Sequence, residues 1–272
     1  MPICNLRIAS SSLVLAALVA AGPASAFDPK KVFKEDDNQA VILRYGMEAY
    51  RNGRKDEAAS VFRYANQKKV LAGTWKLATM HAVGDGVEKD HFKAFRLFHQ
   101  IADRFDTIRP TRQDLPYVSS AVTALADYYL TGIEKTPVRK NPAAAVHYYN
   151  RAAALYGYPK AQFKLGQLYL SGDLGSSQPR QAARWLKRAS SKGHAGSQAI
   201  LGVLYFEGKG VRRNPVHGLV LLAAAEENAK GPKQIEWIRS ERLRAFGLAS
   251  DKQRSEAVKR AKQMGLTLVA SE

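Results

Sequence analysis

The chain has 272 residues, of which 46% are hydrophobic and 24% charged, a balance typical of globular proteins and not of disordered ones. Its formal net charge of +18 favours anionic partners: an acidic protein face, lipid head groups or anionic polymers. The one cysteine, Cys4, stands near the start of the chain, so a framework of disulfides is excluded.

The first 26 residues differ from the rest of the chain. Arg7 is their only charge, an apolar run covers Leu13–Ala21, and small residues follow, with Ala24 and Ala26 in an A-x-A arrangement. This pattern predicts a secretory signal peptide over residues 1–26, cleaved after Ala26. A membrane anchor is disfavoured because the apolar run is too short to cross the ~30 Å of a bilayer core. For an exported protein, nucleic acid is not an expected partner despite the basic charge.

A helical pattern recurs about five times between residues 39 and 230. In each clear copy a leucine is followed four positions later by tyrosine or histidine, and seven positions later by glycine. This spacing places an apolar face on a first helix and then reverses the chain. A second helix with alanines and bulky apolar residues completes the copy. After a less regular copy that begins at Val41, the leucines are Leu77, Leu125, Leu165 and Leu201.

A single hairpin of this size cannot bury its apolar surface, so the copies are expected to stack. The sequence therefore predicts an all-α fold, a right-handed α-solenoid of antiparallel helix pairs over residues 39–230. Residues 27–38 are expected to form a loose N-terminal arm. Residues 231–272 are expected to be capping helices, with helical stretches at 234–246 and 252–263.

An insertion at residues 103–120 separates the second and third copies. It contains Pro110 and Pro116 and is not expected to be continuous helix. It is a candidate for protease access or partner contact, and a merely tolerated loop is an equally good interpretation.

The candidate docking residues lie on the second helix of the fourth copy. On the face opposite its apolar stripe, this helix carries four basic residues, here named the basic strip: Arg180, Arg184, Lys187 and Arg188. They form a candidate docking surface for an acidic protein partner. The alternative is an ordinary solvated outer face.

Motifs for catalysis are missing from the sequence. There is no H-E-x-x-H or G-x-S-x-G, and His91 and His99 lack an acid at a useful position between them. We therefore expect no enzymatic activity, no cofactor and no metal site. His81, His194 and His217 stand at or near turns, where they are either pH sensors or ordinary packed histidines.

The repeated L-G-x-x-Y-x-x-G turn and the alanine-rich second helix resemble the Sel-like branch of the tetratricopeptide superfamily. The resemblance is clearest at Leu165-Gly166, Tyr169, Gly172, Ala182, Trp185, Ala189 and Gly193. It implies a superhelical adaptor that binds other proteins and has no enzymatic activity.

A narrower resemblance is to the ExoR family of exopolysaccharide regulators of alphaproteobacteria. It rests on four stretches, in this order along the chain: Gly22–Pro29, Thr136-Pro137-Val138-Arg139, the run from Ala161-Gln162-Phe163 to Leu170-Ser171-Gly172, and Gly193-His194-Ala195-Gly196. It implies a periplasmic inhibitor that binds the sensing domain of the ExoS histidine kinase and holds the ExoS–ChvI two-component system off. A periplasmic protease would relieve the inhibition, changing exopolysaccharide production, motility and the response to a host or to acid. The alternative is a general cell-envelope scaffold that binds peptidoglycan or an assembly complex.

Overall fold

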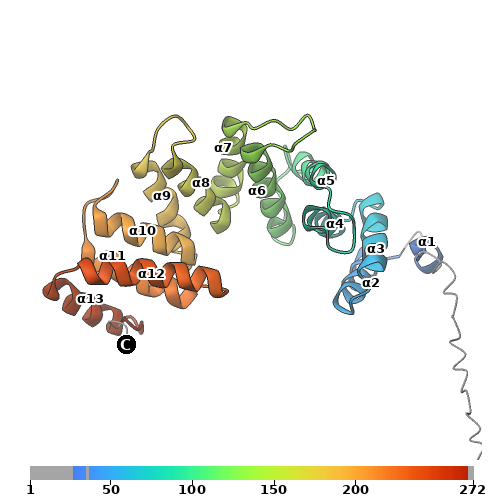
Figure 1. Cartoon of the computed structure of the whole chain (residues 1–272). Helices are drawn as coiled ribbons and strands as arrows, with labels where there is room; N and C mark the ends of the chain where they lie inside the picture. Colours follow the sequence, from blue (N-terminus) through green and yellow to red (C-terminus); the bar gives the residue numbers. More distant parts are fainter. Residues whose placement is uncertain (1–26, 35–36, 269–272) are drawn as a thin grey trace, which may run out of the picture.

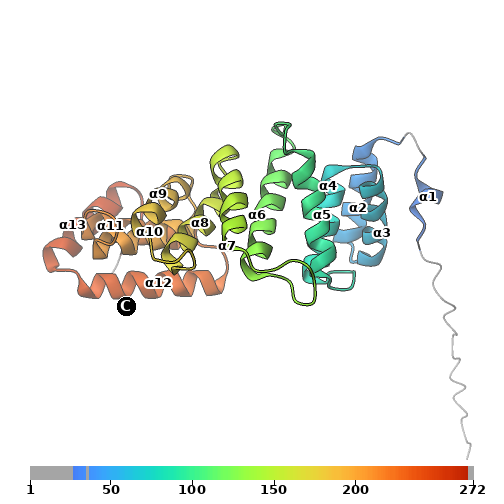
Figure 2. The ribbon, with the colours of Figure 1, turned by 90° about the horizontal axis from the view of Figure 1, so that it is seen from above.

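The computed structural model describes residues 27–34 and 37–268, which fold into helices α1 to α13 and one π-helical turn, with no strand in these two ranges. Five successive hairpins follow the short helix α1 (Pro29–Val32): α2 (Gln39–Arg51) with α3 (Lys55–Gln67), α4 (Leu71–Val83) with α5 (His91–Arg104), α6 (Leu115–Thr131) with α7 (Pro142–Asn150), α8 (Pro159–Ser171) with α9 (Pro179–Ser190), and α10 (Ala195–Glu207) with α11 (Pro215–Asn228). They stack into a curved array (Figure 1), seen as a row from above (Figure 2). The predicted all-α solenoid is confirmed.

Local sequence sets where each hairpin turns. Gly172 and Gly208 cap α8 and α10 with φ of 83° and 78°, a left-handed conformation that glycine adopts without the steric penalty of a Cβ. Pro179 and Pro215 then begin α9 and α11, where a missing backbone N–H costs no helical hydrogen bond. Glycine and proline thus mark the two sides of these turns.

Buried side chains join neighbouring hairpins to one another. One cluster of buried residues extends from Leu71 in α4 to Leu168 in α8, and Leu125 and Leu165 within it have no exposed surface. Tyr149 is also fully buried, and its hydroxyl donates to Asp127 Oδ1 at 2.5 Å. Because neighbouring hairpins share these contacts, no hairpin is stabilised on its own.

Part of the stretch predicted as a loose arm, residues 27–38, is held against the first hairpin. Phe33 follows α1 and is only 6% exposed. Its ring lies 5.4 Å from that of Tyr45 and 5.8 Å from that of Tyr64, measured between centroids. Burial of this one aromatic side chain anchors the segment to α2 and α3.

The chain departs from the simple repeat around the insertion. Helix α5 ends at Arg104 and α6 begins at Leu115, so the irregular part is shorter than the predicted 103–120. Pro116 lies in the first turn of α6, where proline is compatible with helix. After α7, residues Arg151–Leu155 form a π-helical turn that the sequence pattern does not reveal.

Two helices follow the last hairpin: α12 (Pro232–Leu248) and α13 (Asp251–Gln263). Ile238, Ala245, Ala257 and Ala261 are fully buried in a cluster that also contains residues of α10 and α11. The apolar faces of α10 and α11 are therefore covered at this end of the array.

Candidate protein-binding surface

The four residues of the basic strip are exposed on α9, as their helical spacing predicts. Leu186 and Ala189, on the opposite face of the same helix, are fully buried. The guanidinium of Arg188 lies 4.7 Å from the ring centroid of Trp185, a cation–π contact within the helix. In the described ranges Arg180, Arg184 and Lys187 have no ion pair with an acid. The contact with Trp185 leaves the charge of Arg188 in place and no acid pairs with it in the described ranges, so the strip presents four positive charges to solvent.

Several basic residues farther along the chain, unlike those of the basic strip, form ion pairs with acids. The Glu226 carboxylate forms ion pairs with Arg239, through Nε at 2.7 Å, and with Arg242, through Nε at 2.6 Å. The Glu207 carboxylate forms ion pairs with Lys209 Nζ at 2.9 Å and with the Arg244 guanidinium at 3.2 Å. The hydrogen bond from Lys209, helped by Arg244 and opposed by burial, lowers the pKa of Glu207. Much of the positive charge on α12 is thus paired within the chain, which sets the basic strip apart.

A hollow of about 490 Å³ adjoins the start of the basic strip. It lies between the first two turns of α9, with Arg180 and Arg184, and the loop that contains Gly210. Gly210 has a φ of 71°, and a Cβ there would lie 2.4 Å from the Pro179 carbonyl carbon. Only glycine lets this loop approach α9 so closely, so the turn before α11 shapes the surface beside the strip.

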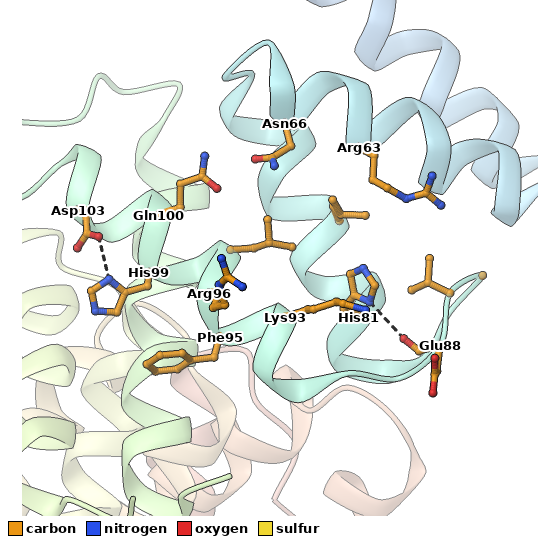
Figure 3. Close-up of a pocket in the computed structure, with 14 residues that line it drawn as sticks. Arg63, Asn66, His81, Glu88, Lys93, Phe95, Arg96, His99, Gln100 and Asp103 are labelled. Carbon is orange, nitrogen blue, oxygen red and sulfur yellow. Dashed lines mark hydrogen bonds and ion pairs between the residues drawn. The ribbon is translucent and has the colours of Figure 1, made fainter. Parts of the chain in front are cut away.

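A larger groove of about 960 Å³ lies between α3 and α5. We name it the α3–α5 groove (Figure 3). Its apolar side chains include Leu77, Val87 and Leu97, and its polar ones include Arg63, Asn66, His81, Glu88, Lys93, Arg96, His99, Gln100 and Asp103. The sequence did not point to this groove, because it forms between two consecutive repeats.

The insertion is fastened at its start by one side chain from the π-helical turn. Arg151 donates to the carbonyl oxygens of Ala102 at 3.0 Å and Phe105 at 2.6 Å, and pairs with Asp106 at 3.1 Å. Beyond these contacts Ile108 is 63% exposed. The insertion therefore has an anchored start and an accessible middle.

The three turn histidines have different surroundings. His194 caps α10: its Nδ1 accepts from the backbone N–H of Ser197 at 3.2 Å, and burial is the main cause that lowers its pKa. Burial, with Arg260 and Lys187 nearby, also lowers the pKa of His217. His81 Nδ1 lies 3.2 Å from the Glu88 carbonyl oxygen. His194 and His217 are thus packed against the fold, whereas His81 borders the α3–α5 groove.

Two further questions from the sequence concern metals and membranes. Within residues 27–34 and 37–268, no group of three or more histidine, cysteine or acidic side chains is placed to hold a metal ion. His99 instead pairs with Asp103 at 2.9 Å. In the same ranges, no helix combines the length and apolar character needed to cross a membrane. The predicted signal peptide and its cleavage residues Ala24 and Ala26 lie outside the described residues.

Known proteins match this chain in sequence and in fold. The Sel1 repeat matches residues 72–104, 119–156, 159–194 and 195–229, which correspond to the hairpins from α4 to α11. An exopolysaccharide production negative regulator from Rhizobium meliloti (strain 1021) is 37% identical over 264 residues, 96% of each chain. Another from Rhizobium leguminosarum bv. viciae is 37% identical over 246 residues, 90% of this chain and 89% of the relative.

The crystal structure of a Sel1 repeat protein from Oxalobacter formigenes superimposes with a TM-score of 0.63 at 22% identity, over 86% of this chain and 90% of that one. At this identity the likeness supports the fold alone. The sequence matches add the family: this chain belongs to the Sel1 repeat family and is related over nearly its whole length to the rhizobial exopolysaccharide production negative regulators.

Proposed function

We propose that this protein is a negative regulator of exopolysaccharide production that acts by binding another protein and not by catalysis. The observation that carries the proposal is the 37% identity, over 96% of the chain, to a regulator with that role. A solenoid of stacked hairpins suits this role, since such folds offer long surfaces for binding other proteins. The proposed partner is the periplasmic sensing domain of a two-component histidine kinase of the ExoS–ChvI type, which the bound regulator keeps inactive.

The proposed contact is the basic strip. Arg180, Arg184 and Lys187 carry unneutralised charge on a rigid helix, a favourable arrangement for an acidic surface, which it would attract and orient. Charge reversal at Arg184 and Lys187 tests this contact. We expect the R184E/K187E variant to bind the purified sensing domain at least about tenfold more weakly, because exposed charges that meet an acidic face become repulsive.

A matched control is available at the other end of the array. Arg44 and Arg51 are exposed on α2, and the R44E/R51E variant changes the net charge by the same amount. If both variants lose affinity equally, the effect comes from net charge and the basic strip is a solvated face.

The proposal places the protein in the periplasm. Its support is the sequence pattern of residues 1–26. Amino-terminal sequencing of the protein purified from periplasmic extract should begin at Phe27. An intact amino terminus on cytoplasmic protein would contradict this placement.

The inhibition is proposed to end by proteolysis. The exposed middle of the insertion, around Ile108, is the proposed point of attack, since proteases cleave accessible irregular backbone. Mapping the fragments that appear when exopolysaccharide production is induced tests this site. Cleavage only in other segments would show that the insertion is not the site of proteolysis.

A second function is a scaffold in the cell envelope that binds peptidoglycan or an assembly complex. The net charge of +18 favours it, because anionic polymers would also bind unneutralised cations. Co-sedimentation with purified cell wall separates the two functions. A regulator that binds a kinase is expected to stay in the supernatant.

A further inference from the structure

Two exposed aliphatic side chains border one small hollow between the insertion and the π-helical turn. Ile108 of the insertion is 63% exposed, and Leu155 of the turn is 67% exposed. This hollow, here named the insertion hollow, has a volume of about 130 Å³, and the buried Phe105 and half-buried Tyr156 also line it. A cavity of about 150 Å³ holds one benzene ring, so these residues border a space for about one side chain.

Arg151 holds the two walls of the insertion hollow together. Its guanidinium donates to the carbonyl oxygen of Phe105 at 2.6 Å on one wall, and its Nε donates to the hydroxyl of Tyr156 at 3.3 Å on the other. The Arg151 side chain is only 10% exposed, and it pairs with Asp106 at 3.1 Å. The hollow is therefore a fixed part of the fold, and the negative charge of Asp106 beside it is neutralised within the chain.

The remaining charge around the insertion hollow is positive. Arg109 lines the hollow and pairs with no acid in the part of the chain that the structure describes. Lys192, just after α9, donates to the carbonyl oxygen of Gly157, the residue that follows Tyr156, and it too pairs with no acid in the described ranges. An occupant would therefore meet aliphatic surface with cations at its edge, which favours an apolar residue flanked by acidic ones.

The basic strip runs toward the insertion hollow. Arg180, Arg184 and Arg188 follow one another at four-residue spacing, which keeps them on one side of α9, and Lys192 continues this spacing in the turn after the helix. The helix advances about 12 Å from Arg180 to Arg188, at about 1.5 Å per residue. Because Lys192 contacts the Gly157 carbonyl oxygen, a chain that lies along the strip reaches the hollow within a few more residues.

We propose that the partner binds with an acidic segment along the basic strip and with an aliphatic side chain of the same segment in the insertion hollow, between Ile108 and Leu155. The inference rests on the proposed function in taking the strip as the contact for an acidic partner. A side chain that fills the hollow leaves water, so it adds affinity and fixes the position of the acids along α9. The occupant also covers the proposed point of proteolytic attack, so partner binding and cleavage exclude each other.

Fluorescence polarisation with the full chain tests the proposal with two fluorescein-labelled peptides. Both contain a run of eight glutamates, which extends to about 26 Å at roughly 3.3 Å per residue and so covers the strip. The leucine peptide carries a glycine and then a leucine at each end, so that either chain direction places a leucine at the hollow. The serine peptide has serine in place of both leucines. We expect the leucine peptide to bind at least about fivefold more tightly, because one aliphatic side chain leaves water.

The advantage of the leucine peptide should disappear in I108S/L155S, while binding of the serine peptide stays unchanged. V83S/L248S is the matched control, since Val83 and Leu248 are 69% and 67% exposed and do not line the insertion hollow. In this control the advantage should remain. Because all four side chains are exposed, both variants should fold normally, and circular dichroism checks this.

Equal affinity of the two peptides, or a leucine advantage that survives in I108S/L155S, would overturn the proposal and leave the basic strip as the contact. R184E/K187E should weaken binding of both peptides at least about tenfold, and unchanged binding there would overturn the proposal together with the strip. In analytical ultracentrifugation, a dimer that becomes monomeric in I108S/L155S would mean that a second copy of this chain fills the hollow instead. A sensing domain that does not bind, with the leucine advantage intact, would contradict only the kinase as partner.

Discussion

The close packing of α10 against α11 predicts that a glycine-to-alanine substitution lowers stability here, although the same substitution inside a helix is usually stabilising. Gly218 of α11 faces Gly202 of α10, and a Cβ at position 218 would lie 2.6 Å from the Gly202 carbonyl oxygen and 3.0 Å from the Phe206 backbone nitrogen. Backbone atoms cannot rotate away as a side-chain end can, so Gly218→Ala must push the two helices apart. Leu219 and Leu222, both fully buried, pack in this interface.

The expected magnitude comes from two opposing effects. Alanine is favoured over glycine inside a helix by up to about 1 kcal/mol. Overpacking of a tight interior costs about 1–3 kcal/mol, here toward the upper end because both clashes are with backbone. We expect a net loss of about 1–2 kcal/mol in the free energy of unfolding. For a chain of this size that lowers the melting temperature by a few degrees, at about 2–4 °C for each kcal/mol.

Gly247→Ala is the matched control, since a Cβ at that position in α12 meets nothing within 4 Å. We expect this variant to be unchanged or slightly stabilised. Differential scanning calorimetry of both variants and the wild type measures the difference. If Gly218→Ala melts at or above the temperature of Gly247→Ala, the helices are not in the close contact described.

Two further predictions concern the insertion and pH. Arg151→Met removes the hydrogen bonds to Ala102 and Phe105, so limited trypsin digestion within residues 105–114 should be roughly tenfold faster or more; unchanged cleavage would contradict the anchoring role. In the folded chain, burial is the main cause that lowers the pKa of His194 below its usual value of about 6.5. The stability contributed by the neutral imidazole is therefore complete above about pH 6.5 and is lost as the pH falls below that value. Asparagine also caps helices without titrating, so His194→Asn should reduce the drop in melting temperature between about pH 7.5 and about pH 5.5; an unchanged drop would assign it to other groups.

The repeats could be predicted from the sequence because their signals are local. The spacing from Leu165 to Tyr169 and Gly172 lies within one helix and its cap, so no knowledge of distant contacts is needed. The exposure of the basic strip follows from the same 3.6-residue period.

The remaining features depend on contacts between distant residues. The anchoring of Phe33 requires Tyr64, about thirty positions away, to be in place. The α3–α5 groove requires Arg63 and Arg96 to come from neighbouring repeats, and the stacking of hairpins sets their separation. The lack of ion pairs at the basic strip depends on where acids such as Glu226 lie, which the order of residues along α9 does not specify.

The most direct test of the proposed function is the phosphorylation state of the response regulator in the bacterium that carries this protein, measured with and without its gene. Phosphate-affinity gels separate the two forms, and a plasmid copy of the gene provides the control. The proposal predicts more phosphorylated regulator in the deletion strain, together with more exopolysaccharide and lower motility, and full reversal by the plasmid. An unchanged phosphorylation state would contradict inhibition of the kinase.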